Sequence, residues 1–512
     1  MSLPYYIEPF DPAWTLPKLA LVDAQSSTAS SGSPRSAYSS DKLLLGPADR
    51  PFSRRKPPTR LPSARTVERT ACGLVSAAFL FLVLSRETEY VTWRGVTALL
   101  SRASTVAAAP RKNNILKFDT PQPTFRENLR DDLSYLTTFP YAGLTNQLLS
   151  TFKLIYMAGR LGREAILPDL EPNHGEGEYA RYSDFFDLDY LSTQTKVGLA
   201  EWRELKSTDS TTSPVSIARH ERLGCWGEVH GTHEPLVRYD TETSFWPVPP
   251  ALRTTFGVEP TTTYAGIEAV MAYDSNVTAW LDSRISQWFE TVDRAPPLPN
   301  RHLACFDNLF YTSAANLSSY KFVEGEKGAT VEVEGLERDS PVWLEVGQHL
   351  RFTPRVERLV DGVLERLIGD AHSPFIAMHL RQGDFLDLGR ATNESSEIKT
   401  KYSAGLDALR DRLAHLAALE GVEDVARLPV LLATDSTDET LLAELRRMNW
   451  TVIDHDELGT RSRHGGWYPG LLDSAILSRA VGLVGTKRST FTYLAERRIE
   501  TWNGGAAVIV EL

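Results

Sequence analysis

Short apolar runs alternate with amphipathic helical patterns between residues 353 and 499, and this alternation constrains the fold more than any other feature of the sequence. In the clearest helix, Thr353 is the cap, Pro354 is the first residue, and an apolar stripe runs to Ile368 before Gly369 ends it. Further helices are predicted near 403–419, 437–447 and 470–480, and strands at 375–380, 429–435, 449–454 and 482–485. This order of elements predicts an α/β fold with a parallel sheet covered by helices.

The run FIAMHLRQGDFLDL, residues 375–388, leads from a predicted buried strand into a group of polar side chains. Its first four residues are apolar, as in a parallel strand covered on both faces. His379, Arg381 and Asp384 then lie at the carboxyl end of the strand, where open α/β sheets bind ligands. The planar guanidinium of Arg381 suits phosphate oxygens. The alternative is an ion pair between Arg381 and Asp384 that closes a turn at Gly383.

Two further strand ends carry polar residues. Asp435 ends the strand predicted at 429–435, and Ser489 opens the helical sequence STFTYLAERRI. The free N–H groups and the hydroxyls of Ser489 and Thr490 at this helix start would suit a phosphate group. Capping of the helix would also explain Ser489 without any ligand.

The sequence FPYAGLTNQLLSTFKLIYMAGRLGREAILPDL, residues 139–170, predicts a glycine-containing turn, an apolar helix and a strand. Gly143 allows close backbone approach, and the first N–H groups of the helix favour an anion. Gly143 and Asn146 are therefore candidate ligand-binding residues. A helix cap provided by Thr145 or Asn146 would explain them without a ligand. Between residues 171 and 345 the pattern is too irregular to predict a topology.

The overall charge is negative, with 55 Lys and Arg against 66 Asp and Glu and a formal net charge of −11. Binding to phosphate backbones requires a basic face, so we expect no nucleic-acid partner. The three cysteines lack the paired spacing of a zinc site, and no metal cofactor is expected. Asp187 and Asp189 have the spacing of a metal-binding pair but fall in the irregular region, so we assign them no metal.

Residues 1–70 are rich in Ser, Pro and Arg without periodicity, which predicts a disordered tail. An uncharged apolar run follows at 71–85, between Arg69 and Arg86. The basic residues before this run orient the N-terminus to the cytoplasm and predict a signal-anchor helix at 71–86, with the rest of the chain lumenal. A buried core helix is the alternative, because the run is shorter than the roughly 20 residues of a usual span.

Four N-x-S/T sequons lie after the apolar run and none before it, in agreement with this orientation. They are Asn276, Asn316, Asn393 and Asn449. In an oxidising lumen Cys225 and Cys305 could pair, and two free buried thiols are the alternative. Cys72, at the edge of the predicted span, could carry palmitate. We therefore expect a protein of the Golgi or endoplasmic reticulum membrane.

Three separated motifs, GLTNQ at 143–147, HLRQGDF at 379–385 and VGTKRSTFTYLAERRI at 484–499, resemble those of the GDP-fucose protein O-fucosyltransferase family. The resemblance is to a fungal-type, single-pass membrane member and covers roughly residues 135–505. It implies a GT-B architecture, in which two Rossmann-like domains face a cleft that holds the sugar nucleotide. It also implies inverting, metal-independent transfer of fucose from GDP-fucose to a Ser or Thr hydroxyl of a protein.

The resemblance implies roles for individual residues. Arg381, the expected catalytic residue, would hold the β-phosphate, and His379 and Asp384 would support the nucleotide. Ser489, Thr490 and Phe491 would line the site for the phosphates and the guanine base of the nucleotide. Asn146 would reach the cleft from the first domain. The candidate GDP-fucose-binding residues are Gly143, Asn146, His379, Arg381, Asp384, Asp435, Ser489, Thr490 and Phe491. Some family members carry a glutamate base in the glycine-rich turn, which this chain lacks, so the base is unassigned.

The predicted domain organisation follows from these assignments. Residues 87–130 are a stem, residues 131–345 an acceptor-side Rossmann-like domain, and residues 346–512 a GDP-sugar-binding domain. The expected partners are GDP-fucose, an acceptor in the secretory pathway and the membrane. A glycan acceptor, or a non-catalytic GDP-sugar-binding lumenal protein, are the alternative functions.

Overall fold

The structure is a computed structural model. It describes residues 115–140, 142–173, 177–208, 220–227, 252, 255–264, 302–306, 309, 310, 312, 313, 318, 319, 335–387, 389, 391–420 and 424–512. The predicted tail (1–70), the predicted membrane helix (71–86) and Cys72 lie outside these residues. Within the described ranges, no helix has both the length and the apolar character needed to cross a bilayer.

The C-terminal half of the described chain forms a five-stranded parallel sheet in the order β11-β10-β9-β12-β13. Its strands are β9 (Ile376–Leu380), β10 (Val430–Thr434), β11 (Trp450–Val452), β12 (Gly482–Thr486) and β13 (Ala506–Val510). β9 comes first in the chain and lies between β10 and β12, so the chain winds outward from it in both directions. The strand order therefore reverses between β9 and β12, which is where doubly wound sheets bind ligands.

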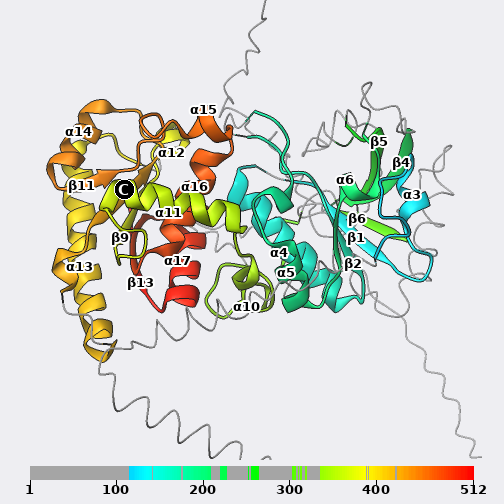
Figure 1. Cartoon of the computed structure of the whole chain (residues 1–512), viewed down its shortest axis with the longest axis horizontal. Helices are drawn as coiled ribbons and strands as arrows, with labels where there is room; N and C mark the ends of the chain where they lie inside the picture. The colour runs from blue at the N-terminus through cyan, green and yellow to red at the C-terminus, as the bar shows by residue number, and fades with distance from the viewer. Residues whose placement is uncertain are drawn as a thin grey trace, which may run out of the picture. The chain divides into compact units, whose positions relative to one another are not determined.

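Helices cover both faces of this sheet (Figure 1). One face, towards which Ala377 and Leu483 point, packs on α11 (Pro354–Ile368), α16 (Tyr468–Arg479) and α17 (Thr490–Asn503). The other, which includes Ile376 and Met378, packs on α13 (Ser395–Glu420) and α14 (Glu439–Arg447). The remaining short helices of this half are α12 (Gly383–Asp387), η3 (Val425–Arg427) and α15 (Thr460–His464). Burial on two faces explains why β9 begins with the apolar residues Ile376, Ala377 and Met378.

The predicted helix before β9 has the bounds expected from its sequence signals. The Thr353 hydroxyl accepts a hydrogen bond from the N–H of Val356, and Gly369 ends the helix with a φ of 82°. Two other predictions need correction. α13 begins at Ser395 rather than near 403, because its first two turns are polar and show no apolar period. β11 ends at Val452 and starts after Asn449, whose φ of 60° is incompatible with a strand.

The N-terminal half of the described chain forms a second parallel sheet, in the order β3-β2-β1-β6-β4-β5. Its strands are β1 (Tyr135–Thr138), β2 (Glu164–Leu167), β3 (Leu199–Glu201), β4 (Glu221–Gly227), β5 (Val258–Tyr264) and β6 (Leu303–Phe306). The other elements are α3 (Phe125–Asn128), α4 (Leu144–Arg160), η1 (Tyr182–Asp184), α5 (Leu188–Thr195), α6 (Trp202–Leu205), α10 (Pro341–Glu345), η2 (Gly347–His349) and the antiparallel pair β7 (Thr312–Ser313) and β8 (Ser318–Ser319). The α/β prediction is therefore confirmed, with two parallel sheets.

Two cores enclose the N-terminal sheet. α4 buries its apolar side chains in a core that continues through α10 to α17 and the C-terminal sheet. On the opposite face, Phe125 and Trp202 pack edge to face with their ring centres 5.8 Å apart. Phe125 and Leu129, which belong to the predicted stem, are fully buried in this second core. The last residues of that segment are thus folded against the sheet.

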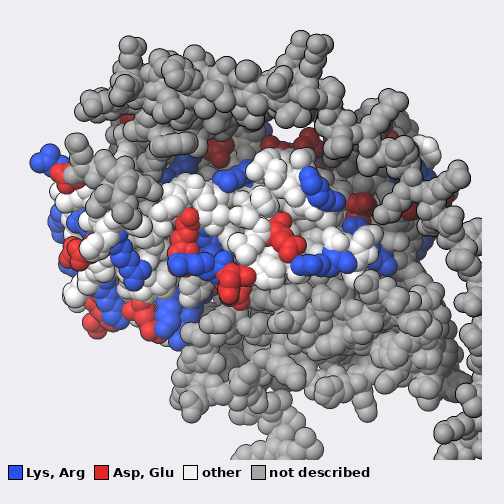
Figure 2. Space-filling model, turned by 90° about the horizontal axis from the view of Figure 1, so that it is seen from below, with Lys and Arg blue, Asp and Glu red and all other residues white. Residues whose placement is uncertain are grey.

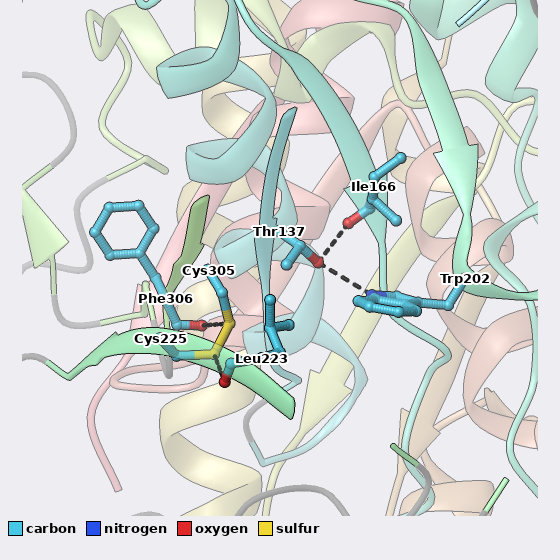
Figure 3. Close-up of a disulfide and its surroundings, with 7 residues drawn as sticks. All are labelled: Thr137, Ile166, Trp202, Leu223, Cys225, Cys305 and Phe306. Atoms are coloured by element: carbon cyan, nitrogen blue, oxygen red, sulfur yellow. Dashed lines mark hydrogen bonds between the residues drawn. A yellow bond between two sulfur atoms is a disulfide. The ribbon is translucent and has the colours of Figure 1, made fainter. Parts of the chain in front are cut away.

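A disulfide joins Cys225 of β4 to Cys305 of β6, which are neighbouring strands (Figure 3). The two Cα atoms are 4.5 Å apart and both side chains are completely buried. Beside them the Thr137 hydroxyl donates to the Ile166 carbonyl (2.8 Å) and accepts from the indole N–H of Trp202 (3.1 Å). Disulfides persist in oxidising compartments, so the pairing and the buried position suggest a protein of the secretory pathway.

Figure 2 shows one face of the molecule, on which Lys and Arg are interspersed with Asp and Glu over the described residues. No broad basic area is visible on the described part of that face. The mixed charge on this face agrees with the presence of both signs of charge in the sequence, 55 Lys and Arg against 66 Asp and Glu.

Candidate functional site

Arg381 lies immediately after β9, beside the point where the strand order of the C-terminal sheet reverses. Its backbone N–H donates to the hydroxyl of Thr486, the last residue of β12 (2.8 Å). The buried Tyr402 hydroxyl of α13 donates to the His379 carbonyl (2.7 Å) and is hydrogen-bonded to the Thr486 hydroxyl (2.8 Å). Two buried hydroxyls therefore hold the main chain on either side of Leu380 and set the direction in which Arg381 leaves the sheet.

The side chain of Arg381 is held between two carboxylates. Its Nη2 is 2.7 Å from Asp384 and its Nη1 is 2.7 Å from Asp435. The second oxygen of Asp435 accepts the backbone N–H of Gln382 (2.7 Å). A Cβ at Gly383 would collide with the Asp435 carboxylate, so a larger residue there would displace the partner of Arg381. The predicted pair between Arg381 and Asp384 is thus present, and the guanidinium, with five N–H donors, keeps capacity for a phosphate oxygen.

His379 points from β9 towards α17. Its Nδ1 is 2.7 Å from the hydroxyl of Thr492, and its ring packs on Phe491 with centres 4.9 Å apart. Burial, and secondarily the positive charge of Arg381, lower the pKa of His379 to about 3. The imidazole is therefore neutral at physiological pH and acts as a packed hydrogen-bonding group.

The folded protein is expected to lose stability as the pH falls below 6.5, the ordinary histidine pKa, because the unfolded chain then binds a proton that folded His379 does not. The expected slope for this residue is about 1.4 kcal/mol per pH unit. The free energy of unfolding is measured by denaturation between pH 4.5 and 7.5 for the wild type and for His379→Gln. The contribution of His379 is the difference between the slopes of the two proteins against pH. The exposed His372, changed to Gln, is the control. Parallel curves for wild type and His379→Gln would contradict the assignment.

α17 starts beside Arg381. The Ser489 hydroxyl caps the helix by accepting the N–H of Thr492 (3.4 Å), so the capping role left open by the sequence is present. The next residue, Thr490, donates its hydroxyl to the side-chain oxygen of Asn146 (2.9 Å), across 344 residues of sequence. The N-terminus of α17 therefore touches the N-terminus of α4.

α4 begins at the turn after β1. Gly143 is its N-cap, and no side chain caps the helix, so the predicted cap by Thr145 or Asn146 is wrong. Ala142 adopts the left-handed conformation with a φ of 54°, and its carbonyl accepts the side-chain N–H of Gln147 (2.7 Å). The side-chain oxygen of Asn146 accepts the hydroxyl of Thr490 and does not cap its own helix.

The nine candidate residues form one connected region. Seven lie at the carboxyl edge of the C-terminal sheet, and Gly143 and Asn146 lie at the carboxyl edge of the N-terminal sheet, linked through Asn146 and Thr490. The sequence also indicates Thr486 as a polar residue at the end of a predicted strand, although it is not among the nine candidates. The sequence reasoning missed Tyr402, Gln382 and Thr492, and Tyr402 and Thr492 sit inside helices and give no signal.

Tyr402→Phe is expected to lower enzymatic turnover about tenfold. The buried His379 carbonyl and the buried Thr486 hydroxyl, which position Arg381, each lose a hydrogen-bond partner, at a cost of about 1 to 3 kcal/mol. Tyr135→Phe is the matched control: Tyr135 is also fully buried, and its hydroxyl donates to the Ile115 carbonyl (2.5 Å) and accepts the N–H of Arg130 (2.9 Å) in the core that contains Phe125 and Trp202. Both variants should lose similar stability, and only Tyr402→Phe should lose turnover per folded molecule. Equal turnover in the two variants would contradict a positioning role.

A pocket of about 680 Å³ lies beside α5 and includes none of the nine candidate residues. Its carboxylates serve the local structure: Asp187 accepts the N–H of Tyr190 (2.9 Å), and Glu201 accepts both the N–H (3.1 Å) and the hydroxyl (2.5 Å) of Ser183. Among the described residues there is no group of three metal-ligating side chains. The Asp187 and Asp189 pair is explained by the start of α5.

The doubly wound sheet, with an arginine and a helix N-terminus at its switch point, defines a nucleotide-binding α/β protein. The sequence pattern of the GDP-fucose protein O-fucosyltransferase family matches residues 135–501. The chain therefore belongs to this family of glycosyltransferases, which use GDP-fucose as donor.

Solved structures give distant likenesses. POFUT1 in complex with GDP-fucose is 14% identical, with a TM-score of 0.43, covering 74% of this chain and 99% of that chain. The α-1,6-fucosyltransferase NodZ soaked with GDP-fucose is 12% identical, with a TM-score of 0.30, covering 72% and 93%. Fucosyltransferase NodZ from Bradyrhizobium is 11% identical at the same TM-score of 0.30, covering 71% and 92%. These likenesses are too weak to carry an argument about this chain. A comparison with curated proteins gave no match.

Proposed function

We propose that this protein transfers fucose from GDP-fucose, with inversion, to a Ser or Thr hydroxyl of a protein in the secretory pathway. The observation that carries the proposal is the position of Arg381 at the switch point between β9 and β12, where its backbone N–H donates to the hydroxyl of Thr486, the last residue of β12 before α17. Family membership supplies the donor, and the acceptor is the part that we propose.

The chemistry requires stabilisation of the leaving group. As the bond from fucose C1 to the β-phosphate oxygen breaks, negative charge grows on GDP. The Arg381 guanidinium and the N–H groups of α17 are fixed donors near which that charge would develop. We propose that they do the work for which other enzymes use a divalent ion, so that transfer needs no metal. His379, Asp384 and Asp435 would position the nucleotide and the arginine.

The contact between Asn146 and Thr490 supports a GT-B arrangement of the two sheets. Each of these residues lies in the first turn of a helix that follows a central strand, β1 in one sheet and β12 in the other. The carboxyl edges of both sheets therefore approach each other there. We propose that GDP-fucose binds at this edge, with Gly143 and Asn146 contributed by the N-terminal half and the remaining candidates by the C-terminal half.

Turnover of a panel of sugar nucleotides by the full-length protein tests the proposal. We expect release of GDP from GDP-fucose and much slower turnover of GDP-mannose and UDP-sugars. Protein acceptors and free glycans are then compared with GDP-fucose as donor. Transfer only to glycans would replace the protein acceptor, and tight GDP binding without turnover of any donor would indicate a non-catalytic binding protein.

We propose a single-pass type II topology in the Golgi or endoplasmic reticulum, anchored by residues 71–86. Two of the sequon asparagines, Asn393 and Asn449, are exposed in the described part of the chain and could accept glycans. Protease added to sealed microsomes should remove only the N-terminal tail, and glycosidase treatment should increase the mobility of the protein on gels. Complete digestion in sealed vesicles would contradict this topology.

A further inference from the structure

Inverting transfer needs a base on the side of the sugar opposite the leaving group. The acceptor hydroxyl attacks fucose C1 from the face opposite GDP and must lose its proton as the new bond forms. Arg381, Asp384 and Asp435 lie at the C-terminal sheet, where the leaving group is proposed to bind. The base is therefore sought at the carboxyl edge of the N-terminal sheet, which meets the other sheet at Asn146 and Thr490.

The main chain of Glu171 is hydrogen-bonded to this edge of the N-terminal sheet. It follows β2, the strand next to β1, and the side chain of Gln147 ties its main chain to the turn before α4. Gln147 accepts the N–H of Glu171 (2.9 Å) and donates to the carbonyls of Glu171 (2.7 Å) and Ala142 (2.7 Å). Gln147 itself is only 1% exposed, so water does not compete for these three hydrogen bonds. The turn carries no carboxylate of its own, and the main chain of Glu171 in the neighbouring loop is bound to the same glutamine as the turn.

Within the part of the chain that the structure describes, the other buried or half-buried carboxylates at this edge already have partners. Asp169 is ion-paired with Arg203 (2.7 Å), Asp187 caps α5, and Glu201 binds Ser183. The Glu171 carboxylate makes no hydrogen bond or ion pair with any described residue, although the residue is half-buried. Burial raises the pKa of Glu171, which suits a group that must accept a proton near neutral pH.

We propose that Glu171 is the general base of the transfer reaction. This proposal rests on the proposed function. The acceptor O–H proton passes to the Glu171 carboxylate, the acceptor oxygen forms a bond to fucose C1, and the bond from C1 to the β-phosphate oxygen breaks with its electron pair leaving on GDP. Some members of the family carry a glutamate base in the glycine-containing turn. In this chain, Glu171 in the loop after β2 would take the place of that glutamate.

Hydrolysis of GDP-fucose by the full-length protein, with water as acceptor, tests the base without knowledge of the natural acceptor. Glu171→Gln is expected to lower GDP release by about 10² to 10⁴-fold, with unchanged affinity for GDP. Azide is a nucleophile that has no proton to lose, so added azide should restore GDP release in Glu171→Gln and yield fucosyl azide. Glu178→Gln, an exposed carboxylate in the same loop, should behave as the wild type.

The outcomes separate this proposal from the proposed function. Hydrolysis by Glu171→Gln within threefold of the wild type would overturn the base, and so would a loss that azide does not restore. Arg381→Ala should not be restored by azide, because its defect lies with the leaving group. A wild-type protein that binds GDP but releases none from GDP-fucose, with or without azide, would overturn the proposed function itself.

Discussion

Arg381→Ala is expected to lower GDP-fucose turnover by about 10²-fold or more while the protein stays folded. The guanidinium is a preorganised donor to charge that develops on GDP only as the bond breaks, and removal of one such donor costs about 10² to 10³-fold in turnover. The side chain is 23% exposed and its partners Asp384 and Asp435 are 52% and 30% exposed, so the two ion pairs contribute little to stability.

Arg381→Lys is the conservative control for this prediction. One ammonium group cannot replace a planar fork that bonds Asp384 and Asp435 and still reaches a phosphate, so lysine should not rescue turnover. Turnover and melting temperature are measured on the same preparations. A drop in stability with unchanged turnover per folded molecule would mean that Arg381 only closes the turn at Gly383. Near-normal activity of folded Arg381→Ala would remove the residue from the mechanism.

Loss of the disulfide between Cys225 and Cys305 is expected to destabilise the protein by about 2 to 5 kcal/mol. The bond joins two residues separated by 80 positions in the sequence. A crosslink lowers the entropy of the unfolded chain, and this effect grows with the length of the loop that it closes. The double variant Cys225→Ala and Cys305→Ala is preferred to serine at these positions, because two serines would bury hydroxyls without hydrogen-bond partners. The thermal midpoint of the double variant should fall by roughly 5 to 15 °C.

Two controls distinguish the covalent bond from the packing of the two side chains. Cys72→Ala should leave the thermal midpoint unchanged, because Cys72 has no part in the disulfide. A reducing agent should lower the midpoint of the wild type and have no further effect on the double variant. If the reduced wild type and the double variant both melt within 1 °C of the oxidised protein, the bond is dispensable for stability.

The C-terminal sheet was largely predictable because its signals are local. Thr353, Pro354 and Gly369 mark one helix by short-range backbone rules, and four of the five described strands are apolar runs bounded by turns. β13 was missed although its Ala and Val residues follow a glycine pair, a signal that was present. The topology of the N-terminal sheet could not be predicted, because β3, β4, β5 and β6 are separated by long segments without clear period.

The sequence by itself determined the residue types of the site, since an arginine after a buried strand and hydroxyls at a helix start have chemistry independent of the rest of the chain. It also placed these residues at the carboxyl edge of a parallel sheet. Only the tertiary structure decided which of them meet. Asn146 reaches Thr490 across 344 residues, and Gln147 holds Glu171 beside the turn at Ala142. Such contacts depend on how two sheets pack and how neighbouring strands align, which no local pattern encodes.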